Sequence, residues 1–82
     1  MMNTQPDRLL SFAVEISYAT RDAQARKAAF TVNATGYEQA YELTADHVRR
    51  VQKPSRIFGG RLIGIPLPTN AKQPGVDVGR EG

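Results

Sequence analysis

Cysteine is absent from the 82 residues of this chain. Neither disulfide bonds nor a thiolate metal site can therefore stabilise it, and a disulfide-rich secreted miniprotein is excluded. No apolar run approaches the roughly 18 residues that a membrane span needs. The first eight residues, MMNTQPDR, also lack the basic start and apolar stretch of a signal peptide. We therefore expect a cytoplasmic protein that makes no membrane contact.

Negative charge is missing from thirty consecutive residues, 47–76, which carry six lysines and arginines. Residues 1–46 sum to −2, residues 47–76 to +6 and residues 77–82 to −1, which gives the net charge of +3. A surface of one sign attracts a polyanion or an acidic partner. Charge alone does not distinguish the two.

Two segments alternate apolar and polar residues as half-buried strands do. The first covers residues 9–19 and the second residues 28–34. Cross-strand partners face the same side of a sheet, so the apolar even positions of one strand must pair with those of the other. We expect Ile16 opposite Phe30, which leaves a turn of three or five residues centred on Ala23.

A helix is predicted to follow, because Thr35-Gly36-Tyr37-Glu38 reads as a capping box in which Thr35 and Glu38 bond each other's backbone N–H groups. Pro54 cannot continue the helix, so its end falls near Gln52. Charged residues occupy one face. The opposite, apolar face carries Tyr37, Ala40, Tyr41, Thr44, Val48 and Val51.

After the helix, residues 61–65 predict a third strand, with a tight hairpin about Gly59-Gly60 as the alternative. The single domain then covers residues 9–66, between a flexible N-terminus at 1–8 and a disordered tail at 67–82. This is an α+β fold of order β-β-α-β: a small, mostly antiparallel sheet with one amphipathic helix on one face. A right-handed crossover gives the strand order 2-1-3.

A chain this short buries a thin core, so a second subunit would help to stabilise it. The sheet face away from the helix is expected to show the small side chains Ala13, Ala29 and Thr31, with Leu62 beside them. Such a face could form a homodimer or be solvated.

The main candidate binding residues lie in or beside the carboxylate-free stretch: Arg49, Arg50, Lys53, Arg56, Phe58 and Arg61. The first three end the helix, where cations oppose its dipole, and Asp46 is spaced to pair with Arg50. No such reason explains Arg56 and Arg61. Two arginines around a glycine pair and one aromatic ring suit phosphates and a stacked base. A second cluster, Arg21, Arg26 and Lys27, is expected at the hairpin tip.

No catalytic, metal-binding or cofactor-binding residue is assigned. His47 is the only histidine and lies at the edge of the apolar helix face, without a nucleophile in a known motif. Tyr37 and Tyr41 are expected in the core. The acidic ridge of the helix (Glu38, Glu42 and Asp46) is expected to be solvated. We therefore expect a protein that is not an enzyme.

The plan of a long hairpin, one helix and a closing strand is similar to that of many small accessory proteins of phages and plasmids, including some anti-CRISPR inhibitors. The similarity is one of layout and assigns no residue. Two functions stay open. The basic patch would contact nucleic acid or a nucleoprotein complex, or it would serve a protein-binding adaptor or inhibitor that acts on an acidic partner surface.

Overall fold

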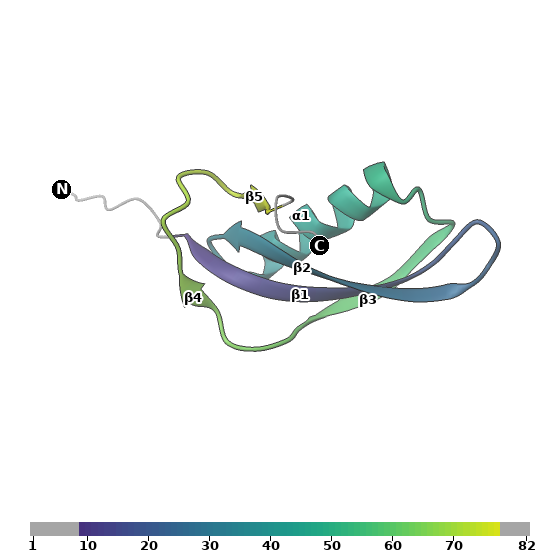
Figure 1. The fold of residues 1–82 in the computed structure, drawn as a ribbon, viewed down its shortest axis with the longest axis horizontal. Coiled ribbons are helices and arrows are strands. Elements are labelled where there is room, and N and C mark those ends of the chain that lie inside the picture. Colours follow the sequence, from purple (N-terminus) through teal and green to yellow (C-terminus); the bar gives the residue numbers. More distant parts are fainter. Residues whose placement is uncertain (1–8, 78–82) are drawn as a thin grey trace.

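One helix packs against one face of a five-stranded antiparallel sheet in the computed structural model, which describes residues 9–77 (Figure 1). The elements are β1 (Leu10–Ala19), β2 (Ala25–Ala34), α1 (Tyr37–Val51), β3 (Arg56–Leu62), β4 (Leu67–Pro68) and β5 (Gly75–Val76). The sheet has the order β3-β1-β2-β5, and β4 pairs with β1 beyond the end of β3. The α+β class and the expected order of the three main strands are confirmed.

The β1–β2 hairpin keeps the expected parity but differs from the expected register by two residues. Ile16 faces Ala28, not Phe30, and Phe30 faces Val14. The strands end at Ala19 and Ala25, so the connecting loop is the five residues 20–24, of the odd length expected but centred on Asp22. A shift of two leaves every side chain on its original face, so the apolar set still points to the core.

The shift in register follows from the conformation of the turn, which contains no glycine. Thr20 N–H donates to the carbonyl of Gln24 (2.9 Å), and the Thr20 hydroxyl accepts from Gln24 N–H (3.1 Å). Ala23 takes the left-handed conformation (φ 66°) that glycine usually supplies in hairpin loops. The chain therefore reverses one residue earlier than the sequence pattern suggested.

Helix α1 starts one residue later than predicted, and the predicted capping box is wrong. Gly36 is the N-cap and offers no side chain. The residue three positions further on is Gln39, and its side-chain oxygen accepts from the backbone N–H (2.8 Å) and the hydroxyl (3.1 Å) of Thr35. Gln39 thus takes the role expected of Glu38, because the position of the N-cap decides which side chain can reach back.

The end of α1 near Gln52 is confirmed. Gln52 N–H and Lys53 N–H both donate to the carbonyl of Val48, at 2.8 and 3.2 Å. Lys53 adopts a left-handed conformation (φ 47°), and Pro54 has no N–H with which to extend the ladder. The chain therefore turns sharply into β3.

The core lies between α1 and the sheet. Its buried members are Phe12, Val14, Ile16, Tyr18, Val32, Ala34, Ala40 and Val48. The buried Thr44 hydroxyl donates to the carbonyl of Ala40 (2.7 Å). The last apolar position predicted for the helix, Val51, is instead 57% exposed, because α1 rises away from the sheet toward its C-terminal end (Figure 1).

The Gly59-Gly60 pair does not form a hairpin, since β3 continues through it beside β1. A Cβ atom on Gly60 would lie 2.8 Å from Ile16 Cδ1 and 2.9 Å from the Tyr41 ring. The Tyr37 hydroxyl donates to the Gly60 carbonyl (3.1 Å). Glycine is therefore present because the helix approaches the strand closely, not because the chain turns.

The prediction of a disordered tail is wrong for residues 67–77. β4 pairs Pro68 with Leu10, and β5 pairs Val76 with Val32. Val76 packs against the core. This segment contains proline and glycine and has little local preference for strand structure. It forms strands because β1 and β2 have edges with which it can pair. Residues 1–8 and 78–82 lie outside the described part of the chain.

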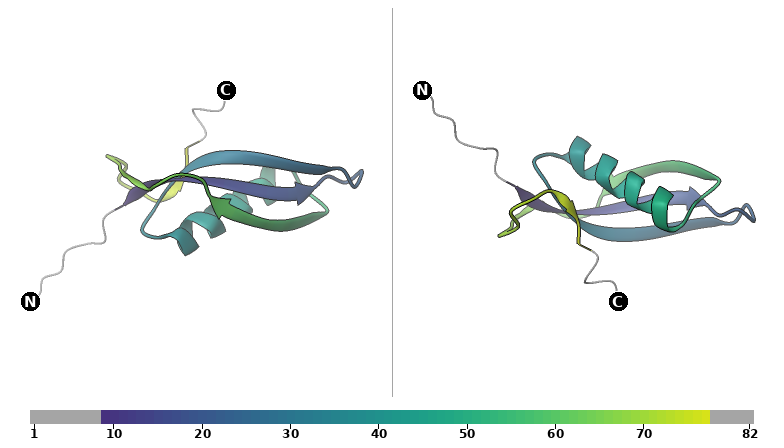
Figure 2. Two further views of the ribbon diagram at one scale, coloured as in Figure 1. Left: turned by 90° about the horizontal axis from the view of Figure 1, so that it is seen from below. Right: turned by 90° about the horizontal axis from the view of Figure 1, so that it is seen from above.

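The sheet face opposite α1 remains open in the described part of the chain (Figure 2). Leu62 does not belong to it as predicted, because β3 places Leu62 opposite Val14, on the core side. The open face carries Ser17, Lys27 and Phe58 near the hairpin end.

Substituting Gly60 by alanine is expected to lower the free energy of unfolding by about 1–3 kcal/mol, since the new methyl group would overlap Ile16 and Tyr41. Urea denaturation of the purified protein measures this. The control is Gly36→Ser, because a Cβ at Gly36 meets no atom within 4 Å and serine is a good N-cap. Equal stability of Gly60→Ala and the wild type would contradict the close packing of α1 on β3.

Substituting Val76 by alanine is expected to destabilise the fold by about 1 kcal/mol, because its side chain packs on the core beside β2. The control, Ile65→Ala, removes a side chain that is 77% exposed and should change stability by less than about 0.5 kcal/mol. Thermal unfolding followed by circular dichroism compares the two. The same midpoint for both variants would show that β5 contributes nothing to the fold.

Candidate functional site

The fold brings the two predicted basic clusters together at one end of the molecule. The loop between α1 and β3 lies along the hairpin, where Ser55 N–H donates to the carbonyl of Ala19 (3.0 Å) and the Ser55 hydroxyl donates to the carbonyl of Thr20 (3.0 Å). Arg56 then pairs with Ala19, whose other neighbour is Ala25. The end of the helix, the start of β3 and the hairpin loop therefore meet (Figures 1 and 2).

We call this region the basic end; its cationic residues are Arg21, Arg26, Lys27, Arg49, Arg50, Lys53 and Arg56. All seven are exposed. Two carboxylates accompany them, Asp22 in the hairpin loop and Asp46 on the helix. The excess of positive charge is therefore concentrated at one end, although the residues come from segments far apart in the sequence.

Only one of these cations has a carboxylate partner among residues 9–77. Arg50 Nε lies 3.2 Å from Asp46 Oδ2, which is the pair that their spacing predicted. Both side chains are more than half exposed, so this pair adds little to stability. The remaining cations of the basic end keep their charge available for a partner.

Arg61 does not join the basic end, although it was grouped with Arg56 in the sequence. Its Nε donates to Glu15 Oε1 at 2.9 Å, across the open face from β3 to β1. Arg61 lies five positions after Arg56 along the strand, a distance of roughly 16 Å. Arg61 therefore has a structural partner, which the sequence did not reveal because Glu15 lies 46 positions away.

Phe58 faces the open side of the sheet at a point where β3 carries a bulge. Ser17 pairs with Gly59 and the next residue, Tyr18, pairs with Ile57, so Phe58 has no partner on β1. Bulges redirect side chains in this way. Ile57 remains against the core, while Phe58 is 56% exposed. The Arg56 guanidinium carbon lies 5.7 Å from the centre of the Phe58 ring, within the range of a cation–π contact.

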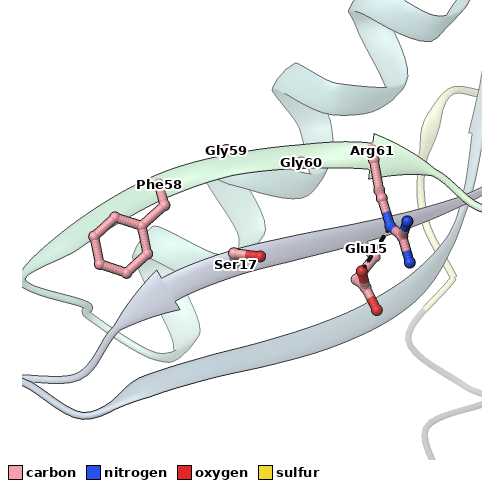
Figure 3. Close-up of a pocket in the computed structure, with 6 residues that line it drawn as sticks. All are labelled: Glu15, Ser17, Phe58, Gly59, Gly60 and Arg61. Atoms are coloured by element: carbon pink, nitrogen blue, oxygen red, sulfur yellow. Dashed lines mark hydrogen bonds and ion pairs between the residues drawn. The ribbon is translucent and has the colours of Figure 1, made fainter.

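Two hollows adjoin at Phe58. The first, of about 190 Å³, is lined by Glu15, Ser17 and the stretch from Phe58 to Arg61 (Figure 3). The second is larger, about 410 Å³, and is lined by Ser17, Ala25, Arg26, Lys27 and Phe58. Phe58 and Ser17 contribute to both, so they are the centre of the candidate site.

Sequence reasoning missed Ser17, and it assigned Lys27 only to the hairpin tip. The two residues are direct cross-strand partners on the open face. Their odd numbering was the available signal, because odd positions of both strands face away from the core. The bulge, which puts Phe58 and Arg61 on the same face, has no such signal.

The other residues considered in the sequence, His47, Tyr37 and Tyr41, make contacts within the fold. His47 packs edge-on against Phe30, with ring centres 5.3 Å apart. Tyr41 packs on the core as expected, whereas Tyr37 is 37% exposed and bonded to β3 through its hydroxyl. No group of three or more His, Asp or Glu residues between positions 9 and 77 is placed to hold a metal ion.

Within the described residues, no helix has both the length and the apolar character needed to cross a membrane. No protein family, no curated protein and no solved structure matches this chain. A function can therefore be proposed only from the physical properties of the site.

Proposed function

We propose that this protein is a non-enzymatic cytoplasmic module that binds nucleic acid through its basic end. The observation that carries the proposal is the convergence of two exposed cationic clusters, from the hairpin and from the α1–β3 junction, at one end of the molecule. Helix chemistry accounts for the cations of the last turn of α1. It does not account for Arg21, Arg26 and Lys27 beside them.

The kind of cation favours phosphate over carboxylate as the ligand. Five of the seven side chains are arginines, whose planar guanidinium groups bind phosphate oxygens in pairs. The charges are spread over two loops, a helix end and two strands, so a flexible, regularly charged backbone can follow them. An acidic protein partner, as for an adaptor or inhibitor, would have to present carboxylates at matching fixed positions.

Direct binding measurements test the proposal. Labelled mixed-sequence oligonucleotides, single-stranded and duplex, are titrated with the protein while fluorescence anisotropy is recorded between roughly 50 and 200 mM salt. With about six phosphate contacts, affinity should fall roughly 1000-fold over this range. No binding to any oligonucleotide at low salt would contradict the proposal. Binding to polyglutamate alone would contradict it as well, and would favour an acidic protein partner.

The double variant Arg21→Gln/Arg49→Gln removes one cation from each cluster. Loss of two phosphate contacts should reduce the slope of log affinity against log salt by about 1.4 on single strands and 1.8 on duplex. The control, Lys72→Glu, lowers the net charge by the same two units but lies between β4 and β5, at the opposite end (Figure 1). Equal slopes for both variants would show that total charge, and not the basic end, determines binding.

A further inference from the structure

Phe58 lies at a specific irregularity of the sheet. Among residues 56–62, the ladder between β3 and β1 is broken only where Phe58 is inserted between the pairs formed by Ile57 and Gly59. Without the extra residue, strict alternation would not place both Phe58 and Arg61 on the open face. The bulge therefore lets Phe58 and Arg61, three positions apart, both face the open side of the sheet.

The surroundings leave the ring accessible. Ser17 and Gly59 lie beside it with small side chains or none, and the larger hollow continues past them to Ala25. No other aromatic residue faces this side of the sheet between residues 9 and 77. The Phe58 ring is thus a flat apolar surface surrounded by small residues.

Charge around Phe58 is distributed unevenly. The hollow on the β2 side is lined by Arg26 and Lys27, and Arg56 lies over the ring from the start of β3. On the other side, the one carboxylate of the candidate site, Glu15, is bonded to Arg61. The open side of the ring therefore borders on cations, while the nearest negative charge is already paired.

We propose that this face binds single-stranded nucleic acid, with one base stacked on Phe58 and the adjoining phosphates held by Lys27 and other cations of the basic end. The inference rests on the proposed function and names its ligand class. An aromatic side chain on a sheet, bordered by a cationic groove, is the combination that single strands require. Stacking tolerates any base, so binding is expected to have little sequence preference.

Duplex nucleic acid fits this face less well, because its bases are stacked on one another inside the helix and present only edges in the grooves. A protein partner fits less well too. The centres of protein interfaces are rich in apolar and aromatic contacts, whereas Phe58 is a single ring among small and polar side chains. The cations and the single aromatic ring together favour a single-stranded nucleic acid over a duplex or a protein.

A tryptophan at position 58 provides a direct reporter, because the chain has no tryptophan of its own. In Phe58→Trp, single-stranded DNA and RNA should quench the indole fluorescence by stacking on it. Duplex DNA and the base-free polyanion heparin should bind through charge without comparable quenching. Equal quenching by heparin or duplex would overturn the inference, since stacking would then not be its cause.

Affinity measurements on variants of the whole 82-residue chain complete the test. Phe58→Ala should weaken binding to a single-stranded oligonucleotide about tenfold or more, with an unchanged salt slope, whereas Phe58→Tyr should retain the affinity. Ile65→Ala, which removes another exposed apolar side chain, serves as the control. Circular dichroism verifies that each variant is folded.

The outcomes separate this inference from the proposed function. If Phe58→Ala binds single strands as the wild type does, while binding remains salt-dependent, the inference is wrong and the proposed function stands. If no nucleic acid binds, the proposed function fails, and the inference fails with it. If the indole spectrum of Phe58→Trp changes with protein concentration alone, a second copy covers this face, which also overturns the inference.

Discussion

The contact between α1 and β3 at Gly60 determines where β3 lies, and with it the position of the residues on which the proposed function depends. The helix lies so close to the strand that a single methyl group at Gly60 would overlap both Ile16 and the Tyr41 ring. This approach keeps β3 extended beside β1 through two consecutive glycines, which weaken strands when nothing packs on them. Because β3 is fixed along β1, its first residue, Arg56, lies opposite Ala19 next to the hairpin loop.

The basic end is therefore a consequence of topology more than of local sequence. Two strands joined by a crossover helix run in the same direction, so the chain must return to the end of the sheet where β2 began. The helix ends there and β3 starts there, which brings the cations of residues 49–56 to those of residues 21–27. Arginines some thirty positions apart in sequence become neighbours without any direct contact between them.

Local patterns were sufficient for β1, β2 and the end of α1, but not for features that depend on a distant partner. The alternation of apolar and polar residues predicted β1 and β2, and Pro54 predicted the end of the helix. The register required knowing that Ala23 adopts a left-handed conformation without glycine. The role of Gly60 and the strands of residues 67–77 depended on packing against residues far away in the chain. In the candidate site, the arginines were visible as charge, whereas the exposure of Phe58 and the Glu15–Arg61 bond required the β1–β3 register.

The two parts of the proposed surface differ in how they would act on a ligand. Exposed cations attract a phosphate backbone over about a Debye length, roughly 8–10 Å, and their contribution weakens as salt is added. Stacking on Phe58 acts only at contact and depends little on salt. Arg56 joins the two, because it belongs to the basic end and also lies over the ring. The Glu15–Arg61 bond has a complementary effect: it neutralises the carboxylate closest to the site, so that a strand lying along β1 meets no unpaired negative charge beside the ring. Charge would thus govern how fast a single strand arrives, and the aromatic ring how long it stays.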